Sequence, residues 1–98
     1  MPPVPTSAQD LADLSPEQWA SVVTSEATVA VPWMQAAARL GNPDAQTALG
    51  QWLLHGHGMP RDHAQAFVWF TQAAEQGHAT GMNMAGRCLA NGWGTPVD

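Results

Sequence analysis

The sequence predicts an all-α solenoid of about five helices, because one helical unit is repeated along the chain. Residues 37–41 and 73–77 both read Ala-Ala-x-x-Gly, and the match continues without a gap at an offset of 36 residues. A period between about 20 and 50 residues is typical of solenoid arrays. Within each unit, apolar residues recur at spacings of three and four, which indicates helices with one buried face. No alternating segment is long enough to predict a strand.

The composition argues against nucleic-acid and membrane partners. The chain has 98 residues, a formal net charge of −5, three Arg and no Lys. Binding to nucleic acid or to an anionic membrane surface needs basic residues that meet the phosphates. No apolar run approaches the roughly 18 residues of a transmembrane helix, and the N-terminus has no signal-peptide pattern. We therefore expect no nucleic-acid partner, no membrane insertion and, by default, a cytoplasmic location.

Residues 1–14 predict a flexible or partly ordered arm. Three prolines among the first five residues prevent a helix at the start, and only a weak apolar cluster follows. A helix is then predicted over residues 16–25. Ser15 can cap this helix, Pro16 suits its first position, and Gln18 lies at the capping-box distance.

The rest of the chain, residues 15–98, is predicted to be one helical-repeat domain closed at its front by this cap helix. The expected repeat units span residues 27–43, 44–79 and 80–98. In the first unit, we expect Pro32 in the first turn of a helix that ends near Leu40. A proline inside a helix costs roughly 3 kcal/mol or kinks it, so a start near the proline is favoured.

The middle unit is predicted to contain two helices joined by the glycine loop 55–60. Asp44 is expected to cap the first helix and Asp62 the second. Gly50 and Gly86 recur inside helices at the same phase of the repeat. Because glycine there costs roughly 0.5–1 kcal/mol relative to alanine, both positions indicate the close approach of a neighbouring helix.

The middle unit resembles the Sel1-like repeat, a branch of the tetratricopeptide superfamily. The residues that carry the resemblance are Gly56, Gly58, Asp62, Trp69, Phe70, Ala73 and Ala74. The resemblance covers roughly residues 27–98 and implies a right-handed α–α superhelix that binds a protein or peptide partner in its concave groove. Gly81 stands where such repeats usually have Ala, so the last unit is expected to be looser. The repeat type, the lack of Lys and the high Ala content suggest a bacterial origin.

By this resemblance, the helices 44–54 and 79–90 would line the groove. Residues 36 positions apart on their outer faces should align across it, and Trp93 takes the loop position that His57 holds in the earlier unit. The expected partner-binding residues are Thr47, Gln51, Leu54, Asn83, Arg87 and Trp93. A solvated polar face remains the alternative for the helix residues, and local packing remains the alternative for Trp93.

Self-association is the competing function. The chain stops where the repeat calls for another helix, so we expect either a longer array or a second chain that covers the exposed face. In a homodimer, the last helix would bury Met82, Met84 and Leu89.

A small-ligand or metal-binding protein is a third class. His55 and His57 share a loop, with His63 nearby, and histidines so spaced can chelate. The equivalent positions in the next loop are Asn91 and Trp93, so solvated loop residues explain the histidines more simply. No metal and no cofactor are predicted.

No catalytic arrangement can be read from the residue spacing. Cys88 has apolar neighbours on a predicted helix, so a buried, inert thiol is expected. Asp44 and Asp62 fit helix caps better than catalytic acids. His78 follows a helix-ending glycine and is expected to pack or to cap. The sequence therefore predicts a non-catalytic interaction scaffold and not an enzyme.

Overall fold

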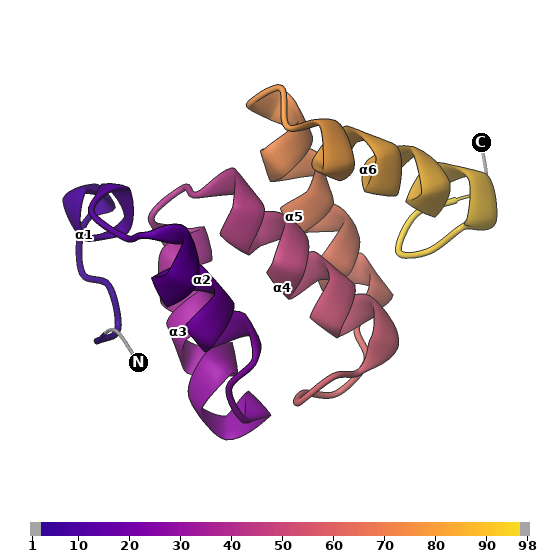
Figure 1. The fold of residues 1–98 in the computed structure, drawn as a ribbon. Coiled ribbons are helices and arrows are strands. Elements are labelled where there is room, and N and C mark those ends of the chain that lie inside the picture. The colour runs from indigo at the N-terminus through magenta and orange to yellow at the C-terminus, as the bar shows by residue number, and fades with distance from the viewer. Residues whose placement is uncertain (1–2, 97–98) are drawn as a thin grey trace.

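The computed structural model describes residues 3–96, apart from the side chains of residues 27 and 28. Within this part, the chain forms six helices and no strand, one helix more than the sequence predicted. The helices are α1 (Ala8–Ala12), α2 (Pro16–Val23), α3 (Ala27–Arg39), α4 (Pro43–His55), α5 (His63–Glu75) and α6 (Ala79–Asn91). Figure 1 shows them in an elongated array that runs from α1 at one end to α6 at the other.

The repeat seen in the sequence is a repeat of whole helices. The bounds of α3 and α5 lie 36 residues apart, and so do those of α4 and α6. The α4–α5 interface is the most extensive, followed by α5–α6 and α3–α4, and α4 also touches α6. Each pair of helices therefore packs on the next in sequence order, as a solenoid requires.

Helix α3 begins at Ala27, so Pro32 lies inside the helix and not in its first turn as predicted. An interior proline removes one backbone hydrogen bond and crowds the preceding turn. The residues around it bury a large apolar surface that offsets this cost. These buried residues are Ala30, Val31, Trp33 and Met34.

The cap of α4 is Asn42 and not Asp44. The Asn42 side chain accepts a hydrogen bond from the backbone N–H of Ala45 at 2.9 Å, and Pro43 occupies the first helical position. Asp44 lies in the first turn, where a carboxylate interacts favourably with the helix dipole. The predicted cap at Asp62 is confirmed by its hydrogen bond from the Gln65 N–H at 3.0 Å.

The N-terminal arm is tied to the first helices. The indole N–H of Trp33 donates a hydrogen bond to the carbonyl oxygen of Pro3 at 2.9 Å. Pro5 and Leu11 are buried, and Leu11 lies on α1, where the sequence had indicated only a weak apolar cluster. Leu14 then leads into α2, whose start shows the predicted capping box at Ser15.

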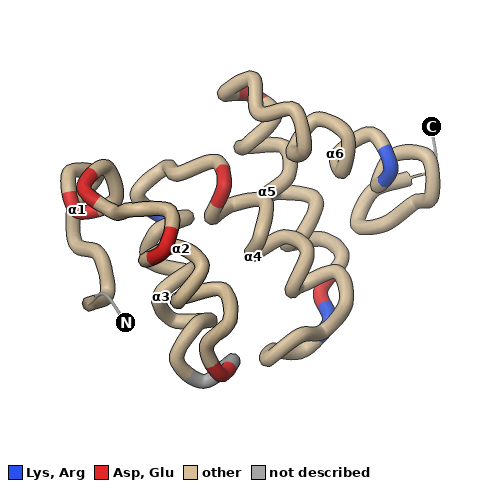
Figure 2. Tube along the Cα trace, viewed as in Figure 1, with Lys and Arg blue, Asp and Glu red and all other residues tan. Residues whose placement is uncertain are grey.

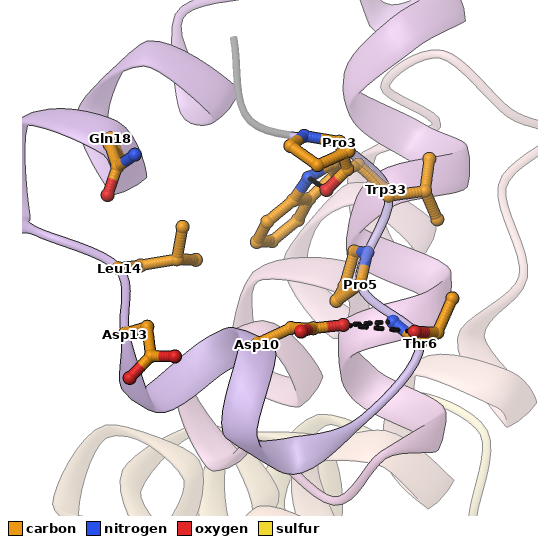
Figure 3. A pocket seen from close by; sticks show the side chains of 9 residues that line it. Pro3, Pro5, Thr6, Asp10, Asp13, Leu14, Gln18 and Trp33 are labelled. Carbon is orange, nitrogen blue, oxygen red and sulfur yellow. Dashed lines mark hydrogen bonds between the residues drawn. The ribbon is translucent and has the colours of Figure 1, made fainter.

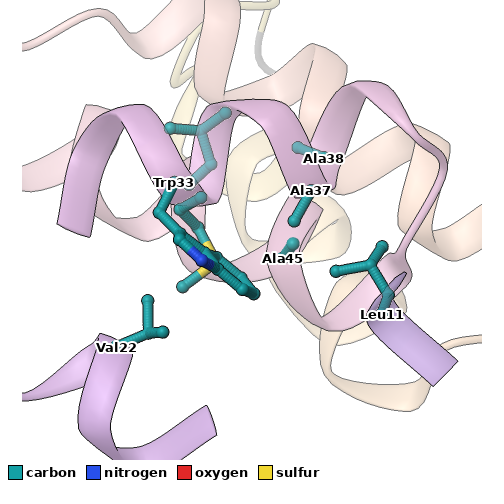
Figure 4. Close-up of a cluster of buried hydrophobic side chains, with 8 residues drawn as sticks. Leu11, Val22, Trp33, Ala37, Ala38 and Ala45 are labelled. Carbon is teal, nitrogen blue, oxygen red and sulfur yellow. The ribbon is translucent and has the colours of Figure 1, made fainter. Parts of the chain in front are cut away.

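Two clusters of buried side chains form the core. The first lies around α3 and contains Leu11, Val22, Trp33, Met34, Ala37, Ala38, Ala45 and Leu49 (Figure 4). The second joins α4, α5 and α6 and contains Leu54, Ala66, Phe70, Met84 and Cys88. Among the described helices, none is long and apolar enough to cross a bilayer.

Candidate functional site

The partner-binding residues predicted on α4 do not form an open surface. Thr47 is 4% exposed and Leu54 is 5% exposed, so their assignment to a solvent-facing groove is wrong. Leu54 belongs to the second core cluster, and the Thr47 hydroxyl lies 3.2 Å from Nδ1 of His78. The face of α4 that was predicted to bind a partner is covered by the following unit. Of the three predicted residues on α4, only Gln51 is partly exposed.

The predicted residues on α6 are more open. Asn83, the equivalent of Thr47, is exposed, and so is Arg87, whose guanidinium lies 3.8 Å from the sulfur of Met84. Trp93 is partly buried against the second core cluster, and its ring lies 6.2 Å from that of His63. Local packing therefore accounts for much of the Trp93 side chain.

The three residues of the predicted oligomer face do not lie together either. Met82 is 55% exposed and Leu89 is partly exposed. Met84 is 6% exposed and belongs to the second core cluster, so it cannot meet another chain without leaving the core. A self-association surface on α6 could therefore use Met82 and Leu89 only.

An open apolar groove lies between α5 and α6 and is called the C-terminal groove below. It has a volume of about 460 Å³. Helix α6 lines it with Met82, Ala85, Gly86 and Leu89. Helix α5 lines it with Phe67, Thr71, Ala74 and Glu75. Apart from Thr71 and Glu75, these residues are apolar or glycine, and no described helix packs over them.

The repeat supplies a filled equivalent of this groove. On α4, the positions that correspond to the α6 lining are Gln46, Leu49, Gly50 and Leu53. Helix α5 covers them, and the ring of Phe70 lies over the glycine. A Cβ atom on Gly50 would stand 2.6 Å from Cε1 of Phe70. A Cβ atom on Gly86 would meet nothing within 4 Å. The close approach predicted at both glycines is thus present at Gly50 and not, among the described residues, at Gly86.

Five of the eight lining positions differ from their equivalents in the filled groove, and two of these changes alter polarity or charge. Gln46, which corresponds to Met82, donates a hydrogen bond to the Ala38 carbonyl at 3.1 Å and accepts one from Gln76 at 3.0 Å. A methionine side chain cannot make these bonds. Glu75 stands where the earlier unit has Arg39, so the charge at the rim is reversed.

The last unit was expected to be looser at Gly81, but the structure shows close packing there. A Cβ atom there would lie 2.7 Å from Cβ of Ala73 and 3.2 Å from the backbone nitrogen of Ala74. The missing side chain therefore lets α6 approach α5 closely. This close contact fixes one wall of the C-terminal groove.

The His78 side chain connects α4 and α6 through hydrogen bonds. Its Nδ1 accepts the N–H of Gly81 at 3.1 Å and caps α6, which confirms the predicted capping role. Since Nδ1 accepts, the ring proton lies on Nε2, which donates to Asp44 at 2.7 Å. The order Asp44, His78, Thr47 superficially matches a hydrolase triad. However, the Thr47 hydroxyl is buried, and Nδ1 already accepts from Gly81. The cluster therefore joins α4 to α6.

The histidines of the first glycine loop and Cys88 do not form a metal-binding or catalytic site among the described residues. His55 and His57 are exposed, and the ring of His57 lies 5.4 Å from that of Trp52. Among the described residues, no three His, Cys, Asp or Glu side chains are grouped to hold a metal ion. Cys88 is buried, and desolvation raises the pKa of its thiol above 9.0, although the charge of Arg87 acts in the opposite direction.

A second cavity, of about 420 Å³, lies beneath the N-terminal arm (Figure 3). Trp33 forms one side of it, and the carboxylates of Asp10 and Asp13 stand at its edge. Thr6 donates to Asp10 from its backbone N–H at 2.9 Å and from its hydroxyl at 3.0 Å. These bonds lower the pKa of Asp10 below 3.8. Figure 2 shows that acidic residues gather over α1 and the start of α2.

Comparison with known proteins identifies the repeated unit. The sequence profile of the Sel1 repeat matches residues 27–42, 43–78 and 79–98. These three segments begin at the first residues of α3, α4 and α6. No curated protein matches the chain.

Proposed function

Because the chain belongs to the Sel1 repeat family, whose repeats generally mediate protein–protein interaction, we propose that it is an interaction module that binds a partner protein through its C-terminal groove. Proteins with these repeats are typically non-catalytic scaffolds. The buried hydroxyl of Thr47 and the buried thiol of Cys88 agree with a non-catalytic role.

The observation that carries the proposal is the difference between two equivalent grooves. In the filled groove, Gly50 is buried under the ring of Phe70, whereas Gly86 is exposed at the base of the C-terminal groove. Beside Gly86, Met82 exposes 55% of its surface. Apolar surface that is contiguous and concave favours binding, because covering it removes apolar area from water.

A site on the concave face, as expected from the sequence, has less support. Thr47 and Leu54 are unavailable there, which leaves partly exposed Gln51 and the exposed side chains of Asn83 and Arg87. These three polar side chains suit the rim of an interface better than its centre. We therefore place the centre of the site at Met82 and Gly86.

Site-specific photocrosslinking in the cells that naturally make the protein tests this proposal. One form carries a diazirine amino acid in place of Met82. A matched form carries it in place of Val23, which is 53% exposed on α2 at the other end of the array. We expect discrete protein adducts from position 82 that do not appear from position 23. Identical adducts from both positions would contradict a site in the groove, and adducts of the chain with itself alone would support self-association instead.

A further inference from the structure

We propose that the C-terminal groove receives an amphipathic helix of another protein, with an aromatic side chain between two small ones and a basic residue five positions before the aromatic. This inference rests on the proposed function and names the chemistry of its partner. It follows from the way α5 (His63–Glu75) occupies the equivalent groove on α4.

The shape of the occupant comes from α5. Ala66, Phe70 and Ala73 lie at spacings of four and three on one face of that helix, and each is 0% exposed. The aromatic ring fits the notch left by Gly50. Ala66 and Ala73 are buried on either side of the ring, and Ala73 also faces Gly81 of α6. A helix that places a ring between two small residues is therefore complementary to a groove of this form.

The C-terminal groove keeps the features that this fit needs. Gly86 provides the same notch, with no atom within 4 Å of a Cβ built there. Leu89 and Ala74 repeat the Leu53 and Ala38 of the earlier unit. Met82 replaces Gln46, so this part of the occupant should be apolar, in contrast to the Gln76 amide that meets Gln46.

The charge of the occupant follows from the rim. In the filled groove, Arg39 and Gln65 border the same small cavity, together with Trp69. The position that corresponds to Arg39 in the C-terminal groove is Glu75. The occupant residue that takes the place of Gln65, five positions before the ring, would thus stand beside a carboxylate, where Lys or Arg is favoured.

A second copy of this chain does not meet these requirements. The residues at the basic position are Gln65 on α5 and, one repeat earlier, Val29 on α3. The equivalent faces of both helices are already buried in the core clusters, with Phe70 on α5 and Met34 on α3 at most 1% exposed. Two copies would also bring together two net charges of −5. A basic helix from a different protein therefore fits this groove better than a second copy does.

A constrained peptide tests this inference. The probe copies residues 63–76 with Gln65→Lys and, to face Met82 with an apolar side chain, Gln76→Leu. A lactam bridge joins positions 64 and 68, which are exposed on α5. The bridge is needed because so short a helix is marginal in water. Calorimetry measures its affinity for the whole chain. Matched probes with the same bridge carry either Phe70→Ala or Gln65→Glu.

Two protein variants accompany the probes. Gly86→Ala places a methyl group where the docked ring must lie and should weaken binding by more than about fivefold, as overpacking does. Circular dichroism must show that this variant is folded, which its open surroundings predict. Glu75→Lys should weaken the Lys probe by about 2- to 5-fold and favour the Gln65→Glu probe instead.

The outcomes separate this inference from the proposed function. If the probe binds the wild type and Gly86→Ala equally, the aromatic ring does not dock at Gly86 and the inference is wrong. The same conclusion follows if the Phe70→Ala probe binds as tightly as the original probe. If no probe binds while crosslinking from position 82 still captures a partner, the groove is a site for a partner of other chemistry. If light scattering shows a dimer that Gly86→Ala dissociates, the occupant is a second copy and the inference is wrong.

Discussion

Replacing Gly50 and Gly86 by alanine should change the stability of the protein in opposite directions. Both residues lie at the eighth position of a 13-residue helix, α4 and α6 respectively. Alanine restricts the unfolded chain and favours the helix, which contributes roughly 0.5–1 kcal/mol at either position. Because this contribution is common to both variants, the difference between them isolates what each new methyl group meets.

At Gly50, the new Cβ would lie 2.6 Å from Cε1 and 2.8 Å from Cδ1 of Phe70. Carbon atoms normally rest about 3.5–4.0 Å apart, so the ring must move by about 1 Å in a site where it is 0% exposed. Overpacking of this kind costs about 1–3 kcal/mol. At Gly86, nothing lies within 4 Å, and the helical gain remains.

Thermal and urea unfolding, followed by far-UV circular dichroism, measure both variants. We expect Gly86→Ala to raise Tm by roughly 2–8 °C, and Gly50→Ala to be about 1–3 kcal/mol less stable than Gly86→Ala. If the two variants change stability equally, the two grooves do not differ as described. A destabilised Gly86→Ala would show that the last helix is covered in solution.

Three further predictions concern single side chains. His78→Ala should destabilise the fold by about 1–3 kcal/mol in urea unfolding, because α6 loses its cap and the buried Thr47 hydroxyl loses its partner. As a control, Thr80→Ala at an exposed position should change stability by less than about 0.5 kcal/mol. The Cys88 thiol should react with Ellman's reagent only on unfolding. Because the pKa of Cys88 is raised in the folded state, its effect on stability is constant below pH 9.0. Above pH 9.0, stability falls as the pH rises toward the folded pKa, and Cys88→Ala should remove this fall. The pKa of Asp10 is lowered in the folded state, so its contribution to stability is present above pH 3.8 and is lost as the pH falls through the folded pKa. The chemical shift of the Thr6 amide should report this titration. Fast labelling of native Cys88, or a Thr6 resonance that does not titrate, would contradict these two assignments.

The sequence predicted the helical repeat well because the residues that shape the backbone turns recur with the repeat. Gly56 and Gly92 adopt positive φ angles at equivalent helix ends, as the paired loops suggested. The cap of α4 was missed, although an Asn directly before Pro43 is a known start signal. The start of α3 was also missed, because the cost of Pro32 was weighed without the buried surface on both sides of it.

The candidate site was harder to predict, since burial on a solenoid helix depends on which neighbour covers it. On α4 alone, Thr47 and Leu54 lie on an outer face, but α5 and α6 bury them. The equivalent positions on α6, Asn83 and Ala90, are exposed because no described helix follows. Periodicity identifies equivalent residues, and only the packing of helices distinguishes a covered position from an open one.

Amide chemical-shift mapping tests the central claim most directly, because it reports where a helix docks on the folded chain. The Lys-bearing probe of residues 63–76 is titrated into the ¹⁵N-labelled protein. The account predicts that the largest shifts cluster at Met82, Gly86 and Leu89 on α6 and at Ala74 on α5, the residues that line the C-terminal groove. Shifts centred instead on Gln51 and the concave face, or on the loop around Trp93, would contradict it.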